Sequence, residues 1–252
     1  MGSFTEWIGY WRSRIIYDFK PFNLRKMVKF YSRLIKPGEL CFDIGSHTGN
    51  RTSAFLKIGA RVVAMEPNPK FIELLNRKFS ANPNFKLLTN AIGSSIGTAK
   101  FMISSRHPTI STLSAEWKEV MLGYDSKVKW EKEQMVDVTT LDELIKTYGT
   151  PLFCKIDVEG FEGEALSGLS TPLKALSFEF FPTTPQRTVE CIKRLAEIGN
   201  YQYNWVLTES FKFVSIKWLT EEQILHELGN YHGRKCGDVY AVLQNAENPD
   251  DL

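Results

Sequence analysis

The chain has 252 residues, of which 43% are hydrophobic, and its 31 basic and 29 acidic side chains leave a net charge of +2 at pH 7. This length suits a single α/β domain with additions, and the even charge balance excludes the basic footprint of a nucleic-acid-binding protein. No stretch approaches the ~18 uninterrupted apolar residues of a transmembrane segment. The four cysteines form no Cys-x-x-Cys pair, so we expect no zinc site and a reducing, cytoplasmic location.

The first 35 residues predict an N-terminal helical extension, ahead of a main domain at residues 36–252. Residues 4–19 carry apolar side chains at helical spacing, and residues 24–35 predict a second helix that ends before a Pro-Gly pair. The apolar stripe of the first helix leaves three interpretations open: packing on the domain, forming the seam of a homo-oligomer, or touching a membrane surface.

Strands and helices then alternate, which predicts an α/β fold with a mostly parallel sheet covered by helices on both faces. Residues 201–207 are expected to pair with 211–216, and an antiparallel strand is expected near the C-terminus. The polar residues 104–116 predict a long functional loop. We predict strands at 39–43, 61–66, 85–91, 98–103, 136–139, 152–158, 174–180, 201–207, 211–216 and 238–243, and helices at 50–58, 69–79, 141–148, 161–168, 185–198 and 220–228.

The first strand of this series ends at a carboxylate, Asp43, followed by a glycine turn from Gly45 to Gly49 and then a helix. The second strand ends at Glu66, 23 residues further on, close to the ~20-residue spacing of a ribose-binding acid. The turn lacks the Gly-x-Gly-x-x-Gly pattern that brings backbone against a pyrophosphate. Asp43 would repel a phosphate and attract the ammonium and sulfonium groups of S-adenosylmethionine (SAM). The pattern therefore favours SAM over a nicotinamide dinucleotide.

A second charged cluster lies in the segment Phe153–Leu166. Side chains alternate along a strand, so Lys155, Asp157 and Glu159 are expected on one face, where Lys155 and Asp157 can pair. Ligands of open α/β sheets bind outside the carboxyl ends of strands, so these acids should point at the same crevice as the cofactor turn. A buried ion pair beside an acid at a helix N-terminus is the purely structural alternative.

A further acid, Glu179, interrupts an apolar strand between phenylalanines, where burial would raise its pKa unless it met a cation. Two interpretations stay open. Glu179 shares a divalent cation such as Mg²⁺ with Asp157, or it is a core acid that pairs with Lys155 or a backbone amide. In the polar loop, His107 is a candidate base or substrate contact.

Seven segments occur in the order and spacing of FkbM-type SAM-dependent methyltransferases: LCFDIGSHTGNRT, VVAMEPNP, LTNAIGS, STLSAEW, VTTLDELI, FCKIDVEGFEGEAL and GDVYA. The chain resembles this family from about Lys36 to Val242. The resemblance implies a class I methyltransferase (Rossmann-like) domain at 36–252, with SAM as cofactor. It also implies O-methylation of a hydroxyl on a sugar, glycan or natural product. The family often has Asn where this chain has His47.

The motifs and the resemblance together give the expected cofactor site. Asp43 and the backbone of Gly45 and Gly49 would hold the methionine end of SAM, and Glu66 would accept both ribose hydroxyls, because a carboxylate has two oxygens for a vicinal diol. The other expected cofactor residues are His47, Asn68 and, at the adenine edge, Asn90 and Ala91.

The acceptor side follows from the need to remove a proton from a poorly nucleophilic hydroxyl. Asp157 or Glu159 would take this proton, with His107 as the outside alternative. Ser111, Thr112 and Lys155 would contact a small-molecule or glycan substrate. Two alternative functions stay open: a SAM-binding protein without catalysis, and a methyltransferase acting on a nitrogen or carboxyl acceptor. The missing glycine pattern argues against a nicotinamide or nucleotide-sugar enzyme.

Overall fold

The computed structural model describes residues 21–104, 110–124 and 128–244. The helix expected at 4–19, with its suggested oligomer seam, and the candidate base His107 lie outside the described residues. In the described part of the chain, no helix is long and apolar enough to cross a membrane.

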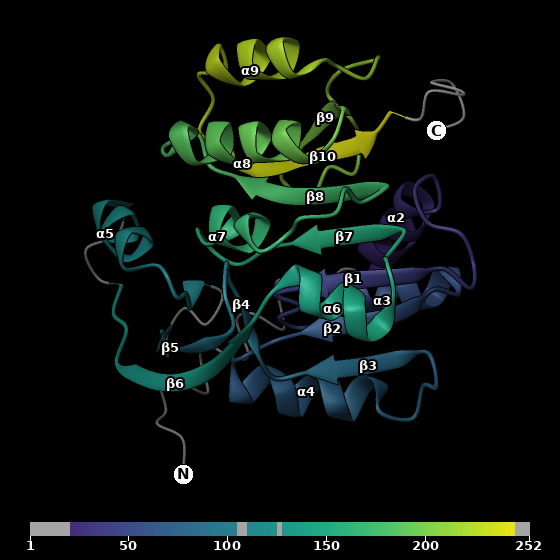
Figure 1. The fold of residues 1–252 in the computed structure, drawn as a ribbon, viewed down its shortest axis with the longest axis vertical. Coiled ribbons are helices and arrows are strands. Elements are labelled where there is room, and N and C mark those ends of the chain that lie inside the picture. Colours follow the sequence, from purple (N-terminus) through teal and green to yellow (C-terminus); the bar gives the residue numbers. More distant parts are fainter. Residues whose placement is uncertain (1–20, 105–109, 125–127, 245–252) are drawn as a thin grey trace.

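The main sheet has seven strands within the described ranges, in the order β3-β2-β1-β7-β8-β10-β9 (Figure 1). Strands β1, β2, β3, β7 and β8 run parallel, and β10 lies antiparallel between β8 and β9. This sheet confirms the predicted α/β class and the antiparallel strand near the C-terminus. Its strands are β1 Leu40–Ile44, β2 Arg61–Met65, β3 Phe85–Leu88, β7 Phe153–Ile156, β8 Ala175–Phe180, β9 Tyr201–Leu207 and β10 Gly237–Leu243.

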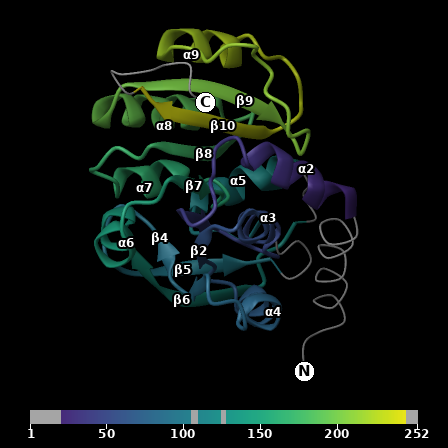
Figure 2. The same ribbon diagram turned by 90° about the vertical axis from the view of Figure 1, so that its right-hand side faces the viewer.

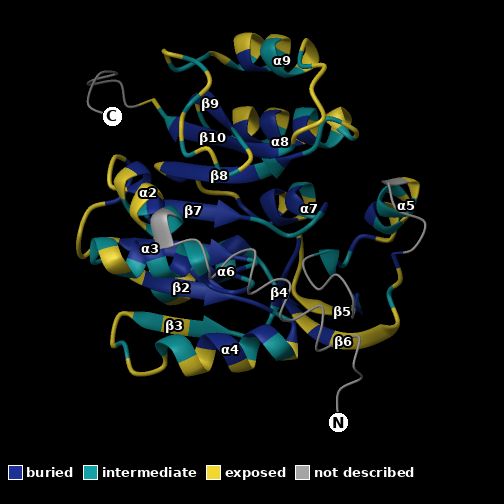
Figure 3. Ribbon diagram, turned by 180° about the vertical axis from the view of Figure 1, so that it is seen from behind, coloured by how far each residue is buried: buried dark blue, intermediate teal, exposed yellow. Residues whose placement is uncertain are grey.

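Helices cover both faces of this sheet (Figure 2). Alternation along β1 explains why: Phe42 points into a core shared with α6, α7, α8 and α9, whereas Cys41 points into a second core shared with α2 and α3. Both cores appear as buried strands beneath half-exposed helices (Figure 3). The helices are α2 Pro21–Tyr31, α3 Asn50–Ile58, α4 Pro69–Phe79, α5 Ala115–Tyr124, α6 Leu141–Tyr148, α7 Glu162–Ser167, α8 Pro185–Ile198 and α9 Glu221–Gly229.

A second, small sheet of strands β4 (Ala91–Ile92), β6 (Lys132–Thr139) and β5 (Gly97–Ile103) lies beside the main one. The sequence predicts strands here but not a separate sheet. The first half of β6 was missed because residues 132–135 are all exposed and show no apolar alternation. Helix α5, which follows the predicted loop, was missed as well.

The predicted pairing of residues 201–207 with 211–216 is wrong except for one bridge, Val206 with Phe213. Strand β9 pairs along its whole length with β10 instead. The reason lies in the backbone of the intervening turn, where Thr208 and Phe211 both have left-handed conformations, with φ of 49° and 50°. Two such residues interrupt the extended geometry that a regular strand needs.

Candidate active site

A cavity of about 320 Å³ opens at the carboxyl ends of β1, β2, β7 and β8. This is the edge of an open α/β sheet at which ligands bind. Acidic side chains outnumber basic ones in its lining. Among the described residues, the carboxylates that line it are Asp43, Glu66, Asp157, Glu159, Glu179, Glu209 and Asp238, against two permanently charged cations, Arg51 and Lys155.

The glycine turn after β1 forms one wall of the cavity. Gly45 has a φ of 78°, and a Cβ atom there would lie 1.8 Å from the carbonyl oxygen of Asp157, so only glycine lets the β1 turn approach the β7 end. Asp43, at the end of β1, is 2% exposed and accepts a hydrogen bond from the hydroxyl of Thr52. Burial raises the pKa of Asp43 to about 6.

Glu66 follows β2 and faces the same wall. Its two carboxylate oxygens accept hydrogen bonds from the backbone N–H groups of His47 and Asn68, each at 2.8 Å. Burial raises the pKa of Glu66 to about 7, although both hydrogen bonds oppose this shift. Each oxygen keeps a further lone pair for a ligand hydroxyl.

The remaining expected cofactor residues divide into two groups. His47, Asn90 and Ala91 line the cavity. Gly49 and Asn68 are not among the described residues that line it, and each supports a neighbouring loop. Gly49 starts α3 with a φ of 81° and leaves no room for a side chain beside α4, and Asn68 caps α4 by accepting a hydrogen bond from the Lys70 amide at 3.1 Å.

Lys155 is fully buried and lies between two carboxylates, with its Nζ 2.7 Å from Asp238 and 3.3 Å from Asp157. The predicted Lys155–Asp157 pair is therefore confirmed. Burial alone would lower the pKa of Lys155, but the charges of Asp157 and Asp238 outweigh it and raise this pKa. The ammonium is thus bound by two of the protein's own acids, and Lys155 is among the residues that line the cavity.

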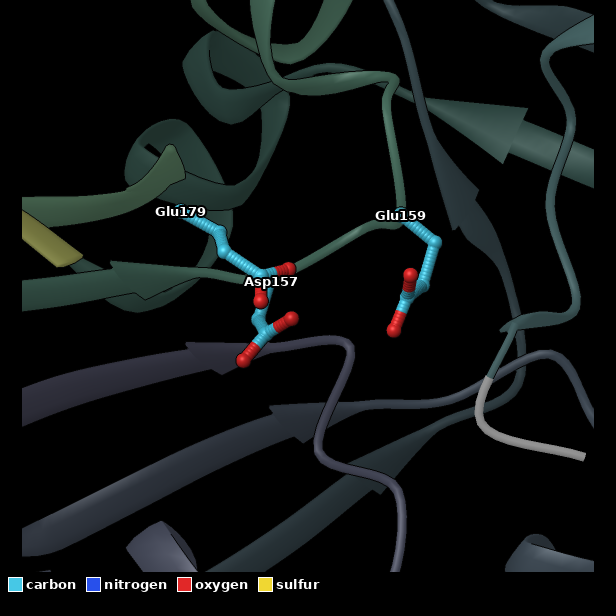
Figure 4. A group of neighbouring side chains, drawn as sticks. All are labelled: Asp157, Glu159 and Glu179. Carbon is cyan, nitrogen blue, oxygen red and sulfur yellow. The ribbon is translucent and has the colours of Figure 1, made fainter. Parts of the chain in front are cut away.

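The acids Asp157, Glu159 and Glu179 form a cluster in which one carboxylate oxygen of each lies within 4.8 Å of the others. Figure 4 shows Glu179 reaching from β8 toward Asp157, while Glu159 approaches from the loop beyond β7. The predicted single strand face is wrong, because β7 ends at Ile156 and Glu159 has a left-handed backbone with a φ of 52°. The turn after β7 instead brings the Glu159 carboxylate near Asp157 and near Glu179 of β8.

The acids of this cluster differ in their affinity for a proton. Burial would raise the pKa of Asp157, but Lys155 and Arg51 hold it below its usual value. Burial and the charge of Asp157 raise the pKa of both Glu159 and Glu179. The physical reason is that Lys155 keeps Asp157 charged, while the negative charge of Asp157 resists ionisation of its two neighbours.

Of the two hydroxyl residues expected to bind substrate, only Ser111 is among the described residues that line the cavity. Thr112 is 1% exposed, and its hydroxyl donates to the backbone carbonyl of Glu159 at 2.8 Å. Thr112 therefore contacts the backbone of Glu159 and is not among the described residues that line the cavity.

Sequence reasoning missed three cavity residues that form one ion-pair network. Arg51 from α3 pairs with Glu209 at 2.8 Å and lies 4.0 Å from Asp238. Asn23 of α2 donates a hydrogen bond to Glu209, which ties the N-terminal helix to the cavity rim. Two of the segments that resemble the family contain members of this network, Arg51 in LCFDIGSHTGNRT and Asp238 in GDVYA, but the sequence analysis assigned neither residue a role.

A parallel sheet with an antiparallel strand inserted before its last strand, and acids at the ends of β1 and β2, define a class I SAM-dependent methyltransferase fold. The family comparison agrees: the sequence model described as "Methyltransferase FkbM domain" matches residues 43–213. The chain belongs to the FkbM methyltransferase family. Family and fold together support SAM as the methyl donor.

Similar proteins include the hexuronic acid methyltransferase AglP of Haloferax volcanii, 26% identical over 143 residues, or 56% of this chain and 54% of that protein. A chloroplastic ribosomal RNA small subunit methyltransferase of Arabidopsis thaliana is 33% identical over 54 residues, 21% of this chain and 16% of that protein. The matches thus span about half of one relative and less of the other. A TehB-like SAM-dependent methyltransferase from Corynebacterium glutamicum shares the fold, with a TM-score of 0.50, 11% identity and coverage of 95% and 98% of the two chains.

Proposed function

We propose that this protein transfers the methyl group of SAM to a hydroxyl oxygen on a sugar, glycan or natural product. The observation that carries this proposal is the cluster of Asp157, Glu159 and Glu179 in the same cavity as the cofactor acids Asp43 and Glu66. A hydroxyl is a poor nucleophile at neutral pH and must lose its proton during transfer. A carboxylate beside the acceptor can take up this proton.

The charge of the cavity favours a hydroxyl over a carboxylate as the acceptor. Both permanent cations of the described lining, Arg51 and Lys155, are already paired with acids of the protein. A substrate carboxylate would meet unpaired negative charge there, and it would need no base. The name of AglP states that this relative acts on a hexuronic acid. For the present chain we propose an acceptor that is uncharged at the reacting end.

On the cofactor side, we propose that Asp43 and the backbone of Gly45 bind the methionine end of SAM and that Glu66 accepts the ribose hydroxyls. Asn90 and Ala91 would border the adenine. His47 would contribute its backbone, because its N–H already orients the Glu66 carboxylate. We assign Gly49 and Asn68 to the support of these loops, in keeping with their packing and capping contacts.

On the acceptor side, we propose that Asp157 or Glu159 takes the hydroxyl proton. Lys155 keeps Asp157 ionised and able to accept a proton, and its own contacts make it a residue that positions Asp157 rather than one that binds substrate. Ser111 lines the cavity and is proposed to hydrogen-bond the acceptor. His107 lies outside the described residues and stays the alternative base.

A divalent cation is the second way to activate the hydroxyl. The oxygens of Asp157, Glu159 and Glu179 are close enough to share one hard cation, and carboxylates are the ligands that Mg²⁺ prefers. Such an ion would lower the pKa of a coordinated hydroxyl. The two routes differ in a simple way, because only one of them depends on added metal.

The test is methyl transfer from radiolabelled SAM to a panel of neutral glycosides, with the matching uronic acids and amino sugars included. We expect label on neutral glycosides, and Asp157→Asn or Glu159→Gln should lower turnover by roughly 10²–10⁴-fold while SAM binding persists. Glu164→Gln, a change to an exposed acid of α7, is the matched control. Label found on the carboxyl group of the uronic acids or on the nitrogen of the amino sugars, with none on a hydroxyl of any panel member, would reject the hydroxyl acceptor. SAM binding with no transfer to any panel member would favour a non-catalytic protein.

Full activity after exhaustive EDTA treatment would reject the cation and leave the carboxylate base. Loss of activity that Mg²⁺ restores would favour the cation, and in that case Glu179→Gln should be as damaging as the changes at Asp157 and Glu159.

A further inference from the structure

The segment Ser111–Trp117 touches both the cavity and the turn that carries Glu159. Ser111 and Leu113 line the cavity. Between them, Thr112 points the other way and donates its hydroxyl to the Glu159 carbonyl at 2.8 Å. The same hydroxyl oxygen accepts a hydrogen bond from the Ser114 amide at 2.9 Å. One short stretch of chain therefore contacts the acceptor side of the cavity and the backbone of a catalytic candidate.

The Glu159 turn has a backbone that needs such support. Glu159 and Gly160 have φ of 52° and 83°, and a left-handed conformation is unfavourable for a residue with a side chain. A Cβ atom at Gly160 would lie 2.8 Å from the ring of Trp117, which is fully buried. The turn therefore packs against the Trp117 ring through Gly160 and accepts a hydrogen bond from the Thr112 hydroxyl through the Glu159 carbonyl.

Arg187 of α8 fastens the segment and the turn together. Its guanidinium donates to the Gly160 carbonyl, to the Ser114 hydroxyl at 3.3 Å and to the Glu116 carboxylate at 2.8 Å. It also lies over the Trp117 ring, 5.9 Å from the ring centroid. These contacts join α8, the start of α5 and the Glu159 turn at one point.

We infer that Thr112 is a positioning residue that acts through Glu159, and that Arg187 fixes the segment from which Thr112 acts. This inference deepens the proposed function, because it rests on Glu159 serving the acceptor hydroxyl. A loosened turn would leave the cofactor end of the cavity intact, since Thr112 contacts none of the cofactor acids through its hydroxyl. The consequence of losing Thr112 should therefore appear in turnover and not in SAM affinity.

The first measurement uses hydrogen exchange of protein saturated with S-adenosylhomocysteine. Thr112→Val keeps the shape of the side chain and removes the hydroxyl. We expect amides of peptides covering residues 158–162 to exchange at least tenfold faster in this variant. Thr112→Ser, which keeps the hydroxyl, should recover most of the protection. Thr98→Val, the same change at an exposed position of β5, should leave these peptides unaffected. Unchanged exchange in Thr112→Val would overturn the inference.

The second measurement is a double-mutant cycle on turnover of the best neutral glycoside from the panel. We expect Thr112→Val to lower kcat by roughly tenfold, the loss of about one hydrogen bond, with an unchanged Kd for SAM. In the Glu159→Gln background this tenfold loss should disappear. If the two losses multiply, or if Thr112→Ser loses as much as Thr112→Val, Thr112 does not act through Glu159.

The cycle also separates this inference from the proposed function. If Glu159→Gln has the wild-type turnover rate, Glu159 is not the proposed base. The positioning role of Thr112 is then rejected as well. If Glu159→Gln loses turnover while Thr112→Val keeps the wild-type kcat, the proposed chemistry is retained and only the role of Thr112 is rejected.

Discussion

Replacing Glu66 tests the cofactor assignment most directly, because this residue has two tasks that can be separated. Its oxygens already accept hydrogen bonds from the His47 and Asn68 amides at 2.8 Å, and the residue is 5% exposed at the cavity wall. Glu66→Ala would leave both amides without this acceptor, at a cost of about 1–3 kcal/mol each if they stay buried. A fall in SAM affinity in Glu66→Ala could then come from loosened loops or from lost ribose contacts, and the affinity alone would not separate the two.

Glu66→Gln separates the two effects when it is combined with a change in the ligand. Hydrogen bonds to a charged group contribute about 1.5–3 kcal/mol, so wild-type protein should bind a ligand with ribose hydroxyls roughly 10- to 100-fold more tightly than the dideoxy analogue. Methylthioadenosine and its 2′,3′-dideoxy form are suitable, with calorimetry as the assay. Glu66→Gln should lose most of this discrimination.

The pH dependence gives the same prediction an independent check. Burial raises the pKa of Glu66 to about 7 in the free protein, so the ionised form that accepts hydroxyls is depleted as the pH falls below 7. The preference for the ribose hydroxyls should therefore weaken between pH 8 and pH 6 in wild-type protein and stay flat in Glu66→Gln. Equal discrimination by wild type and variant would refute the ribose assignment. Binding of NADH without binding of SAM would refute the whole cofactor assignment.

Three further outcomes are expected. Burial raises the folded-state pKa of Asp43 from 3.8 to about 6, so this carboxylate becomes costly to the folded state as the pH rises through that window. In denaturant titrations, the stability of Asp43→Asn relative to wild type should therefore rise by about 2 kcal/mol between pH 4 and pH 7. Gly45→Ala should lose about 2–5 kcal/mol and abolish SAM binding, whereas Gly38→Ala, equally left-handed but with open space around it, should lose only about 1–2 kcal/mol. Lys155→Met should destabilise the fold by about 3–5 kcal/mol in the same titrations, since it leaves Asp157 and Asp238 without their shared cation; a loss below 1 kcal/mol would contradict this account of the pair.

The first βαβ unit could be predicted closely because local chemistry determines it. Apolar runs define β1 and β2, and left-handed glycines mark both ends of α3: Gly49 with a φ of 81° before it and Gly59 with a φ of 99° after it. Helix α4 likewise begins with a proline, Pro69, directly after the Asn68 cap. These signals act over a few residues, so a sequence pattern contains them in full.

Elements set by tertiary contacts were harder to predict. Among the described side chains of helix α5, only Trp117 is fully buried, and it packs on Gly160 and Phe181, which are distant in sequence. The left-handed turn at Glu159 also escaped prediction, because a run of alternating charges was taken as a longer strand. Both errors concern the same place, where the 111–117 segment meets the end of β7.

The ion-pair network beneath the acceptor end shows why the rest of the site lay beyond sequence reasoning. β10 runs antiparallel beside β8, which sets Asp238 directly opposite Glu179, and like charges in that relation repel unless a cation intervenes. Lys155, two strands away on β7, reaches Asp238 at 2.7 Å, and Arg51 from α3 approaches its other oxygen at 4.0 Å. No local pattern specifies this register. It follows from inserting β10 between β8 and β9. The acids proposed to surround the acceptor are therefore brought together by topology, while the acids proposed to surround the cofactor are brought together by a motif.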